Sequence, residues 1–116
     1  MTDIKVLNKN YINKDYSELI EFVTLYVNIQ EALIDKLIIT VDNNKYIIYD
    51  KRKKVLFNLI EFDDSLLDIV VTLAPKKIEI YNILSFKNRE LIKTIINIFK
   101  ERVEIYNDDF NKNAII

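Results

Sequence analysis

Polar side chains that could bind or react with a small ligand gather at the ends of two similar segments. Residues 77–82 read Lys-Ile-Glu-Ile-Tyr-Asn, and residues 102–107 read Arg-Val-Glu-Ile-Tyr-Asn. If both segments are strands joined by a helix, their carboxyl ends form the sheet edge where ligands usually bind. The residues expected to line such a ligand-binding or active site are Tyr81, Asn82, Ser85, Tyr106, Asn107 and Asp108.

The residue types that are missing exclude most familiar chemistries. The chain has no glycine, no histidine and no cysteine. Walker and Rossmann loops need glycine where the backbone turns sharply or approaches a phosphate. Histidine is the commonest general base and metal ligand, and cysteine would be needed for a thiolate site or a disulfide. We therefore predict no catalytic residue, no metal site and no cofactor. Any catalysis would fall to carboxylates, lysine, tyrosine or hydroxyls.

Four consecutive basic residues could contact phosphate groups. They are Lys51, Arg52, Lys53 and Lys54. The net charge of the chain is −1, so no global field attracts a nucleic acid, and no aromatic residue interleaves the cluster. We expect a solvated turn, and a weak nucleic-acid contact remains the alternative.

The acidic pair Asp63 and Asp64 precedes an apolar segment, residues 66–74, that is interrupted only by Asp68 and Thr72. Two polar residues four apart share one helical face, so the segment reads as a mostly buried helix. A central strand is the alternative, because residues 69–71 are β-branched. The aspartates favour the helix, and we expect them to cap its N-terminus rather than bind a metal.

The elements that position these residues begin with a helix of about fifteen to twenty residues from Asp15. Its apolar residues recur at helical spacing, and we expect them to face the core rather than a partner. They are Leu19, Phe22, Val23, Tyr26, Val27 and Leu33. Next, residues 36–41 and 46–49 predict a hairpin with asparagine in its turn. A further helix, begun by Asn88 and Glu90, connects the repeated segments.

Together these elements predict an α/β (mixed α+β) fold in a single small domain. The order is α-β-β-α-β-α-β, with a four-stranded mixed sheet, helices mainly on one face and a C-terminal right-handed βαβ unit. Residues 15–107 form the domain, residues 1–14 a poorly ordered arm or edge strand, and residues 108–116 a frayed tail. If the repeated strands are neighbours, Glu79 lies beside Glu104. Either Lys77 and Arg102 then compensate, or another strand intervenes.

The N-terminus has no apolar signal region, and no apolar run is long enough to cross a membrane. We therefore expect a cytoplasmic protein without a membrane partner.

Several short motifs resemble a known family. They are residues 18–23 and 27–31, the Asp-Asp-Ser-Leu-Leu opening at 63–67, Leu-Ala-Pro-Lys-Lys-Ile at 73–78 and Ile-Phe-Lys-Glu-Arg-Val at 98–103. Over most of residues 17–106 the chain resembles the C-terminal half of the YtxC-like sporulation proteins of spore-forming Firmicutes. The resemblance implies a cytoplasmic protein linked to endospore formation in a low-GC anaerobe such as a member of the Clostridia. It implies no established biochemical activity.

The chain departs from that family pattern at the ends of the repeated segments. At the end of the first segment the family pattern has His, where this chain has Tyr81. At the end of the second segment the pattern has Cys, followed by a cysteine-rich tail suited to a metal, where this chain has Tyr106. Tyrosine seldom replaces imidazole or thiolate at zinc, so this member should hold no metal there. The chain also lacks the family's N-terminal half and is shorter before Asp63, as expected for a divergent or truncated member.

Three functions remain open. The first, which we favour, is an uncharacterised, non-catalytic, sporulation-associated domain acting through an unknown protein partner or self-association. The second is a ligand-binding or enzymatic domain with its site at the ends of strands 76–82 and 102–107. The third is the weak nucleic-acid contact through Lys51 to Lys54.

Overall fold

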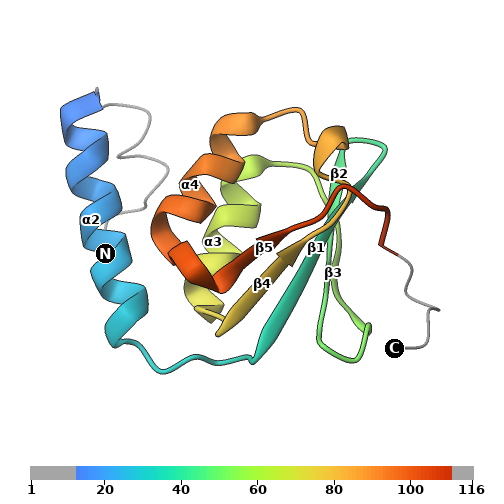
Figure 1. The fold of residues 1–116 in the computed structure, drawn as a ribbon, viewed down its shortest axis with the longest axis horizontal. Coiled ribbons are helices and arrows are strands. Elements are labelled where there is room, and N and C mark those ends of the chain that lie inside the picture. The colour runs from blue at the N-terminus through green and yellow to red at the C-terminus, as the bar shows by residue number, and fades with distance from the viewer. Residues whose placement is uncertain (1–12, 111–116) are drawn as a thin grey trace.

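The computed structural model describes residues 13–110, with side chains from residue 17 onward (Figure 1). The described residues form a small α+β domain with three α-helices and a mixed five-stranded sheet. In chain order the elements are α2 (Asn13–Ile29), β1 (Lys36–Asp42), β2 (Lys45–Tyr49), β3 (Val55–Ile60), α3 (Asp63–Leu73), β4 (Lys77–Ile80), α4 (Arg89–Phe99) and β5 (Val103–Ile105). Short 3₁₀ turns occupy Ile83–Ser85 and Lys100–Arg102.

The sheet has the strand order β3-β2-β1-β4-β5. Strand β2 is antiparallel to β1 and β3, whereas β1, β4 and β5 run parallel. The prediction of four strands in the order α-β-β-α-β-α-β was therefore wrong by one strand, β3. This strand was missed because its pairing with β2 shifts register twice and Leu59 has a positive φ of 56°, so it lacks the regular alternation of a strand.

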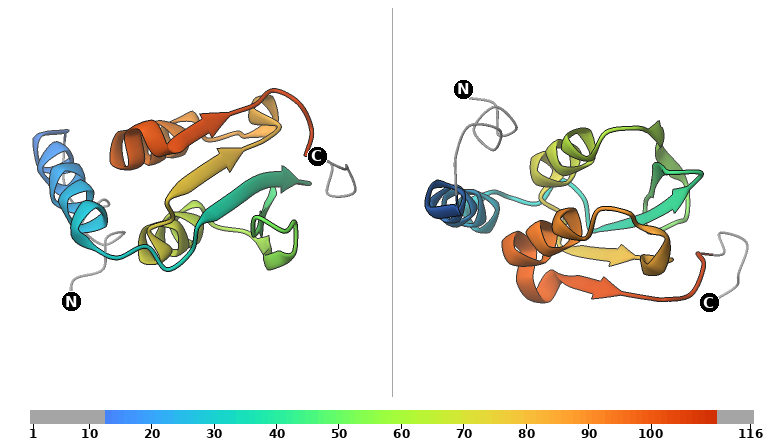
Figure 2. Two further views of the ribbon diagram at one scale, coloured as in Figure 1. Left: turned by 60° about the horizontal axis from the view of Figure 1, so that its bottom comes forward. Right: turned by 90° about the horizontal axis from the view of Figure 1, so that it is seen from above.

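Helices α3 and α4 pack on one face of the sheet, and α2 lies on the same side, beside α4 (Figure 2). On that face Leu37, Ile39, Ile78 and Ile80 are fully buried against apolar residues of α3 and α4. Residues of this face alternate along β1 and β4 with residues of the opposite face, because successive side chains point to opposite faces, and Ile38 and Glu79 are buried on that opposite face. The opposite face of the sheet carries no helix among residues 13–110, and we call it the open face.

The repeated segments pair directly, since β4 and β5 are parallel neighbours joined by α4. Their register places Glu79 beside Glu104. Helix α4 begins as predicted, with the Asn88 side chain accepting a hydrogen bond from the Leu91 backbone N–H at 3.2 Å. The C-terminal βαβ unit is thus present without an intervening strand.

The hairpin of β1 and β2 is also confirmed. Its turn residues Asn43 and Asn44 have φ values of 50° and 66°. Two successive positive φ angles are characteristic of a type I′ turn, which normally selects glycine and tolerates asparagine. Asparagine therefore replaces glycine in a chain that has none.

Helix α3 forms where predicted, which excludes the strand alternative, but its acidic pair does not cap it. The N-cap residue is Phe62, without a side-chain cap bond. The Asp63 carboxylate instead accepts from the Tyr46 hydroxyl and, at 2.7 Å, from the Asn88 side chain. Burial and this carboxylate raise the pKa of Tyr46 well above its ordinary value. Asp63 therefore ties β2 to the starts of α3 and α4.

Helix α2 departs most from expectation. Val23 and Val27 are buried against the core, but Phe22, Tyr26 and Leu33 are exposed, and Leu33 lies beyond the helix end. The predicted core-facing stripe is therefore wrong for those three residues.

The ends of the chain complete the comparison with the predicted boundaries. Of the predicted N-terminal arm, residues 1–12 lie outside the described residues, while Asn13 and Lys14 belong to α2. Of the predicted C-terminal tail, residues 111–116 lie outside the described residues. Phe110 packs its ring 4.6 Å from that of Tyr49 on the open face. No helix within residues 13–110 has the length and hydropathy needed to cross a membrane.

Candidate functional site

The open face of the sheet is built on a cluster of Lys36, Glu79 and Tyr81. The Lys36 ammonium lies 3.1 Å from Glu79 Oε2, and the Tyr81 hydroxyl donates to Glu79 Oε1 at 3.2 Å. Glu79 is only 7% exposed, and an unpaired buried carboxylate would be costly. The lysine from β1 and the tyrosine at the end of β4 remove that cost.

The same cluster recurs one strand further along. The Lys77 ammonium pairs with Glu104 Oε1, and the Tyr106 hydroxyl donates to Glu104 Oε2 at 2.9 Å. The hydrogen bond from Lys77 holds the pKa of Glu104 below its ordinary value, and Glu104 raises the pKa of Lys77 in return. Each glutamate thus pairs with a lysine of the adjacent strand in the sheet: Glu79 with Lys36 of β1, and Glu104 with Lys77 of β4.

This arrangement resolves the repulsion expected between Glu79 and Glu104. Lys77 compensates as predicted, but Arg102 does not. Its guanidinium donates to the carbonyls of Pro75 at 3.1 Å and Val27 at 3.4 Å. Arg102 thereby connects β5 to the end of α3 and to α2, so the two similar segments differ at their first residue.

Aromatic rings cover the end of this face. Tyr81 and Tyr106 stack with centroids 4.6 Å apart and planes 13° from parallel, and Phe110 lies 5.3 Å from Tyr81. Burial, with Glu79 beside it, raises the pKa of Tyr81 to about 12. Both phenols therefore stay protonated near neutral pH and serve as hydrogen-bond donors rather than as nucleophiles or bases.

The remaining predicted strand-end residues meet in loop-closing bonds. Asn82 adopts a left-handed conformation, its backbone N–H donates to the Asp108 carbonyl at 2.9 Å, and the Ser85 hydroxyl donates to its side chain at 2.9 Å. The Asn107 and Asp108 side chains are exposed. The structure thus brings Tyr81 to Tyr106 and Asn82 to Ser85, while a ligand at these strand ends stays a prediction.

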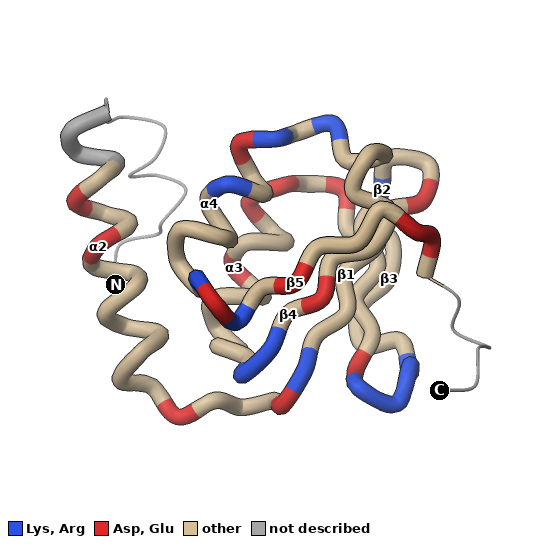
Figure 3. Tube along the Cα trace, in the orientation of Figure 1, with Lys and Arg blue, Asp and Glu red and all other residues tan. Residues whose placement is uncertain are grey.

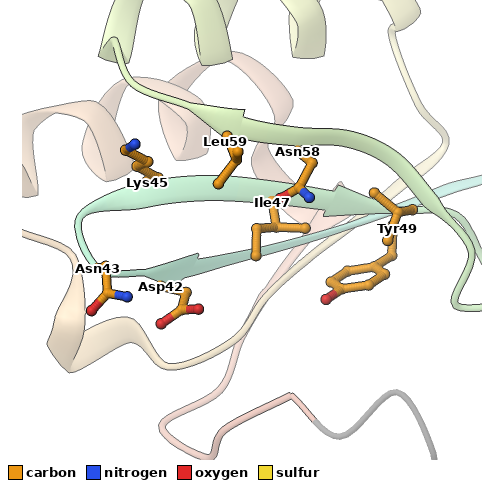
Figure 4. A pocket seen from close by; sticks show the side chains of 8 residues that line it. Asp42, Asn43, Lys45, Ile47, Tyr49, Asn58 and Leu59 are labelled. Carbon is orange, nitrogen blue, oxygen red and sulfur yellow. The ribbon is translucent and has the colours of Figure 1, made fainter.

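Among the cavities formed by the described residues, two are lined by residues other than the six predicted strand-end residues. The first, of about 460 Å³, lies between the hairpin and β3 (Figure 4). It is lined by Asp42, Asn43, Lys45, Ile47, Tyr49, Val55, Asn58 and Leu59. The second, of about 380 Å³, lies beside the loop after β2, with Asp35, Lys51 and Lys76 in its wall. Among the described residues, no three acidic, histidine or cysteine side chains come together as metal ligands.

The basic cluster occupies the turn between β2 and β3, as predicted. Asp50 organises this turn, because its carboxylate accepts from the backbone N–H groups of Arg52 at 2.8 Å and Lys54 at 2.9 Å. Lys51 pairs with Asp35 at 2.8 Å, and this hydrogen bond lowers the pKa of Asp35. The Arg52 and Lys54 side chains are exposed. Phosphate binding through this cluster stays a prediction.

Sequence reasoning missed an exposed apolar surface along α2 and the turn after it. We call it the α2 surface. Its residues lie at spacings of three and four, on one side of the helix. They are Phe22, Leu25, Tyr26, Ile29 and Leu33, which are between 40% and 75% exposed. The signal was in the sequence, because ten of the fifteen residues from 19 to 33 are apolar, which is too many for one core-facing stripe.

A second exposed apolar surface, the β3 surface, lies along the edge strand β3. Its residues are Val55, Leu56, Phe57, Leu59 and Phe62. Edge strands leave one row of backbone N–H and C=O groups without a sheet partner, and natural proteins usually cover or charge such edges. Here the strand itself carries no charged residue.

These features define a small α+β domain whose open face has internally paired charged groups and whose two apolar surfaces are exposed. The sequence model of the YtxC-like family matches residues 4–104, and the chain belongs to that family. No curated protein and no solved structure matches the chain. The predicted resemblance is therefore confirmed over most of its length.

Proposed function

We propose that this protein is a non-catalytic contact domain that binds another protein chain through the α2 surface. The observation that carries the proposal is the exposure of Phe22 and Ile29, at 68% and 75%, on a helix whose other side is anchored in the core. Contiguous apolar patches of this kind mark interaction sites on soluble domains.

Burial of the α2 surface would contribute favourable free energy to a contact. Fully removing one large apolar side chain from water is worth roughly 1.5–3 kcal/mol. The five side chains are 40–75% exposed, so each would contribute part of that value, against the translational and rotational freedom lost on association. A partner would meet a preformed surface, because Val23 and Val27 hold α2 on the domain.

The polar groups of the open face favour this function over catalysis. Glu79 and Glu104 are each occupied by a lysine and a tyrosine. A general acid or base must be able to reach a substrate proton, and these carboxylates are engaged in holding neighbouring strands together.

Membership of the YtxC-like family supports a cellular setting for the contact. We propose that it operates in the cytoplasm during endospore formation, as the family resemblance implies. The test of this setting is the time at which the protein accumulates: it should rise after the onset of sporulation. Constant abundance in growing cells that never sporulate would contradict it.

Site-specific photo-cross-linking tests the contact itself. A photoreactive phenylalanine analogue replaces Leu25 in the α2 surface or, as a matched control, Asn28 on the polar side of the same helix. We expect a discrete cross-linked product from position 25, lost on the additional substitution Ile29→Glu, and none from position 28. Equal products from both positions, or none from position 25, would refute the proposal.

A further inference from the structure

The α2 surface and the β3 surface lie on opposite sides of the domain (Figure 1). Helix α2 packs beside α4 at one side, and β3 is the last strand at the far edge of the sheet. The two views in Figure 2 agree with this separation. One chain therefore cannot cover either surface with the other, but two chains can.

Opposite charges lie along the α2 surface and at the start of the β3 surface. Between residues 17 and 34 the charged side chains are Glu18, Glu21 and Glu31, and all three are exposed. The β3 surface follows directly on the exposed side chains of Lys51, Arg52 and Lys54, and Glu61 near its other end is paired with Lys45 at 3.4 Å. Figure 3 shows the acidic positions along α2 and the basic positions in the loop before β3.

We propose that the partner of the α2 surface is the β3 surface of a second copy of this chain, in a head-to-tail contact. This inference rests on the proposed function and names its occupant. In the contact, apolar side chains of α2 cover the free edge of β3, which is one of the ways in which proteins protect edge strands. The glutamates of α2 then approach Arg52 and Lys54 of the neighbouring copy.

The lengths of the two elements allow them to lie side by side. From Phe22 to Ile29 the helical part of the α2 surface rises about 10 Å at 1.5 Å per residue. From Val55 to Ile60 the strand advances about 16 Å at 3.3 Å per residue. The apolar part of the helix can therefore lie alongside the edge strand within the length of that strand.

Symmetric contacts are disfavoured by the same charges. An α2 surface facing itself would bring six glutamates of two copies together, and a β3 surface facing itself would oppose two basic loops. A contact between different surfaces leaves one surface free at each end of a pair. Such heterologous contacts continue into rings or open chains of subunits.

Concentration-dependent mass is the first test. Analytical ultracentrifugation of the whole chain from about 1 µM to about 1 mM should show a weight-average mass rising above the 13.8 kDa monomer. Phe22→Glu with Ile29→Glu, and separately Leu56→Lys with Leu59→Lys, should each remain monomeric. Matched controls at exposed polar positions outside both surfaces, Asn28→Glu and Asn97→Lys, should associate like the unmodified chain.

Mixing the two monomeric variants tests the head-to-tail arrangement. The α2 variant keeps its β3 surface and the β3 variant keeps its α2 surface, so the mixture should form a discrete species of twice the monomer mass. A symmetric contact cannot be restored by mixing, so two monomers in the mixture would overturn the proposal. Circular dichroism and urea unfolding of each variant confirm that it is folded.

Charge reversal gives an independent measurement. Glu18→Lys with Glu21→Lys should weaken association at least tenfold at low salt, and adding Arg52→Glu with Lys54→Glu to the same chain should restore it. Failure of the combined variant to recover would contradict the charge pairing. A chain that stays monomeric throughout, yet cross-links from position 25 to a different protein, overturns this inference and leaves the proposed function standing.

Discussion

Charged side chains on the open face of the sheet are paired within the chain, whereas apolar side chains on the α2 surface are exposed to solvent. On the open face, Glu79 and Glu104 are each paired with a lysine and a tyrosine, and the two tyrosine rings stack. On the α2 surface, large apolar side chains such as Phe22 and Ile29 lie in solvent. The first region satisfies its groups within the chain, whereas the second gains most from a contact outside it.

The repeated segments hold neighbouring strands of the sheet together. Their Lys-Glu-Tyr clusters pair β1, β4 and β5 through side chains as well as backbone bonds. The proposed contact surfaces instead lie on the elements at the two sides of the domain, α2 and β3. Substitutions in the two regions should therefore separate stability from binding.

The largest loss of stability should follow substitution on the covered face of β4. Ile80 is fully buried, so Ile80→Ala should lower the free energy of unfolding by about 2–5 kcal/mol through lost burial and a cavity. Urea denaturation measures this change in the free energy of unfolding. A loss below about 1 kcal/mol would show that this side chain is not in the core.

The second-largest loss of stability should follow removal of the Glu79 carboxylate, next to Ile80 in β4. Glu79→Ala leaves the Lys36 ammonium and the Tyr81 hydroxyl without their acceptor on a buried part of the open face. We expect a loss of about 1–3 kcal/mol in urea denaturation. Glu104→Ala, at the exposed edge strand, is the matched comparison and should cost less. Equal losses would contradict the different burial of the two clusters.

Alkaline titration should reveal the environment of Tyr81. Its pKa is raised from an ordinary value of 10 to about 12 in the folded chain. The folded chain therefore holds this proton more tightly, and the stability that it contributes is complete below pH 10 and is lost as the pH rises from about 10 to about 12. Tyr81→Phe should show a shallower loss of stability over that interval. Nuclear magnetic resonance can monitor the titration of the Tyr81 ring. A Tyr81 pKa near 10 in the folded chain would contradict this account.

The smallest effect on stability should occur at the α2 surface. Phe22→Ser and Ile29→Ser remove side chains that are mostly exposed, so the free energy of unfolding should change by no more than about 0.5 kcal/mol. Association or cross-linking should nevertheless be lost. A loss of stability as large as that of Glu79→Ala would show that these residues support the fold of the monomer.

Much of the fold could be predicted because local signals agreed with tertiary packing. Asn43 and Asn44 marked the hairpin, Asn88 marked the start of α4, and the repeated segments gave the βαβ unit. Strand β3 could not be predicted because an edge strand exposed on both faces has no alternating pattern, and its register shifts remove the remaining period.

The candidate site was harder to predict than the fold. Apolar periodicity shows that a helix has an apolar side, but it does not show how much of that side the domain covers. Phe22 and Val23 are neighbours of similar character, yet one is exposed and the other is buried. Likewise, the partner of Glu79 is Lys36, which is distant in sequence and reaches it only because β1 pairs with β4.

Dilution of an isotope-labelled chain, followed by nuclear magnetic resonance, tests the central claim most directly. As concentration falls, amide signals of residues 22–33 and 51–62 should shift together, because both surfaces leave the same contact. Signals of β4, β5 and the stacked tyrosines should stay constant. Concentration-dependent shifts confined to the open face, with none in α2 or β3, would contradict the account.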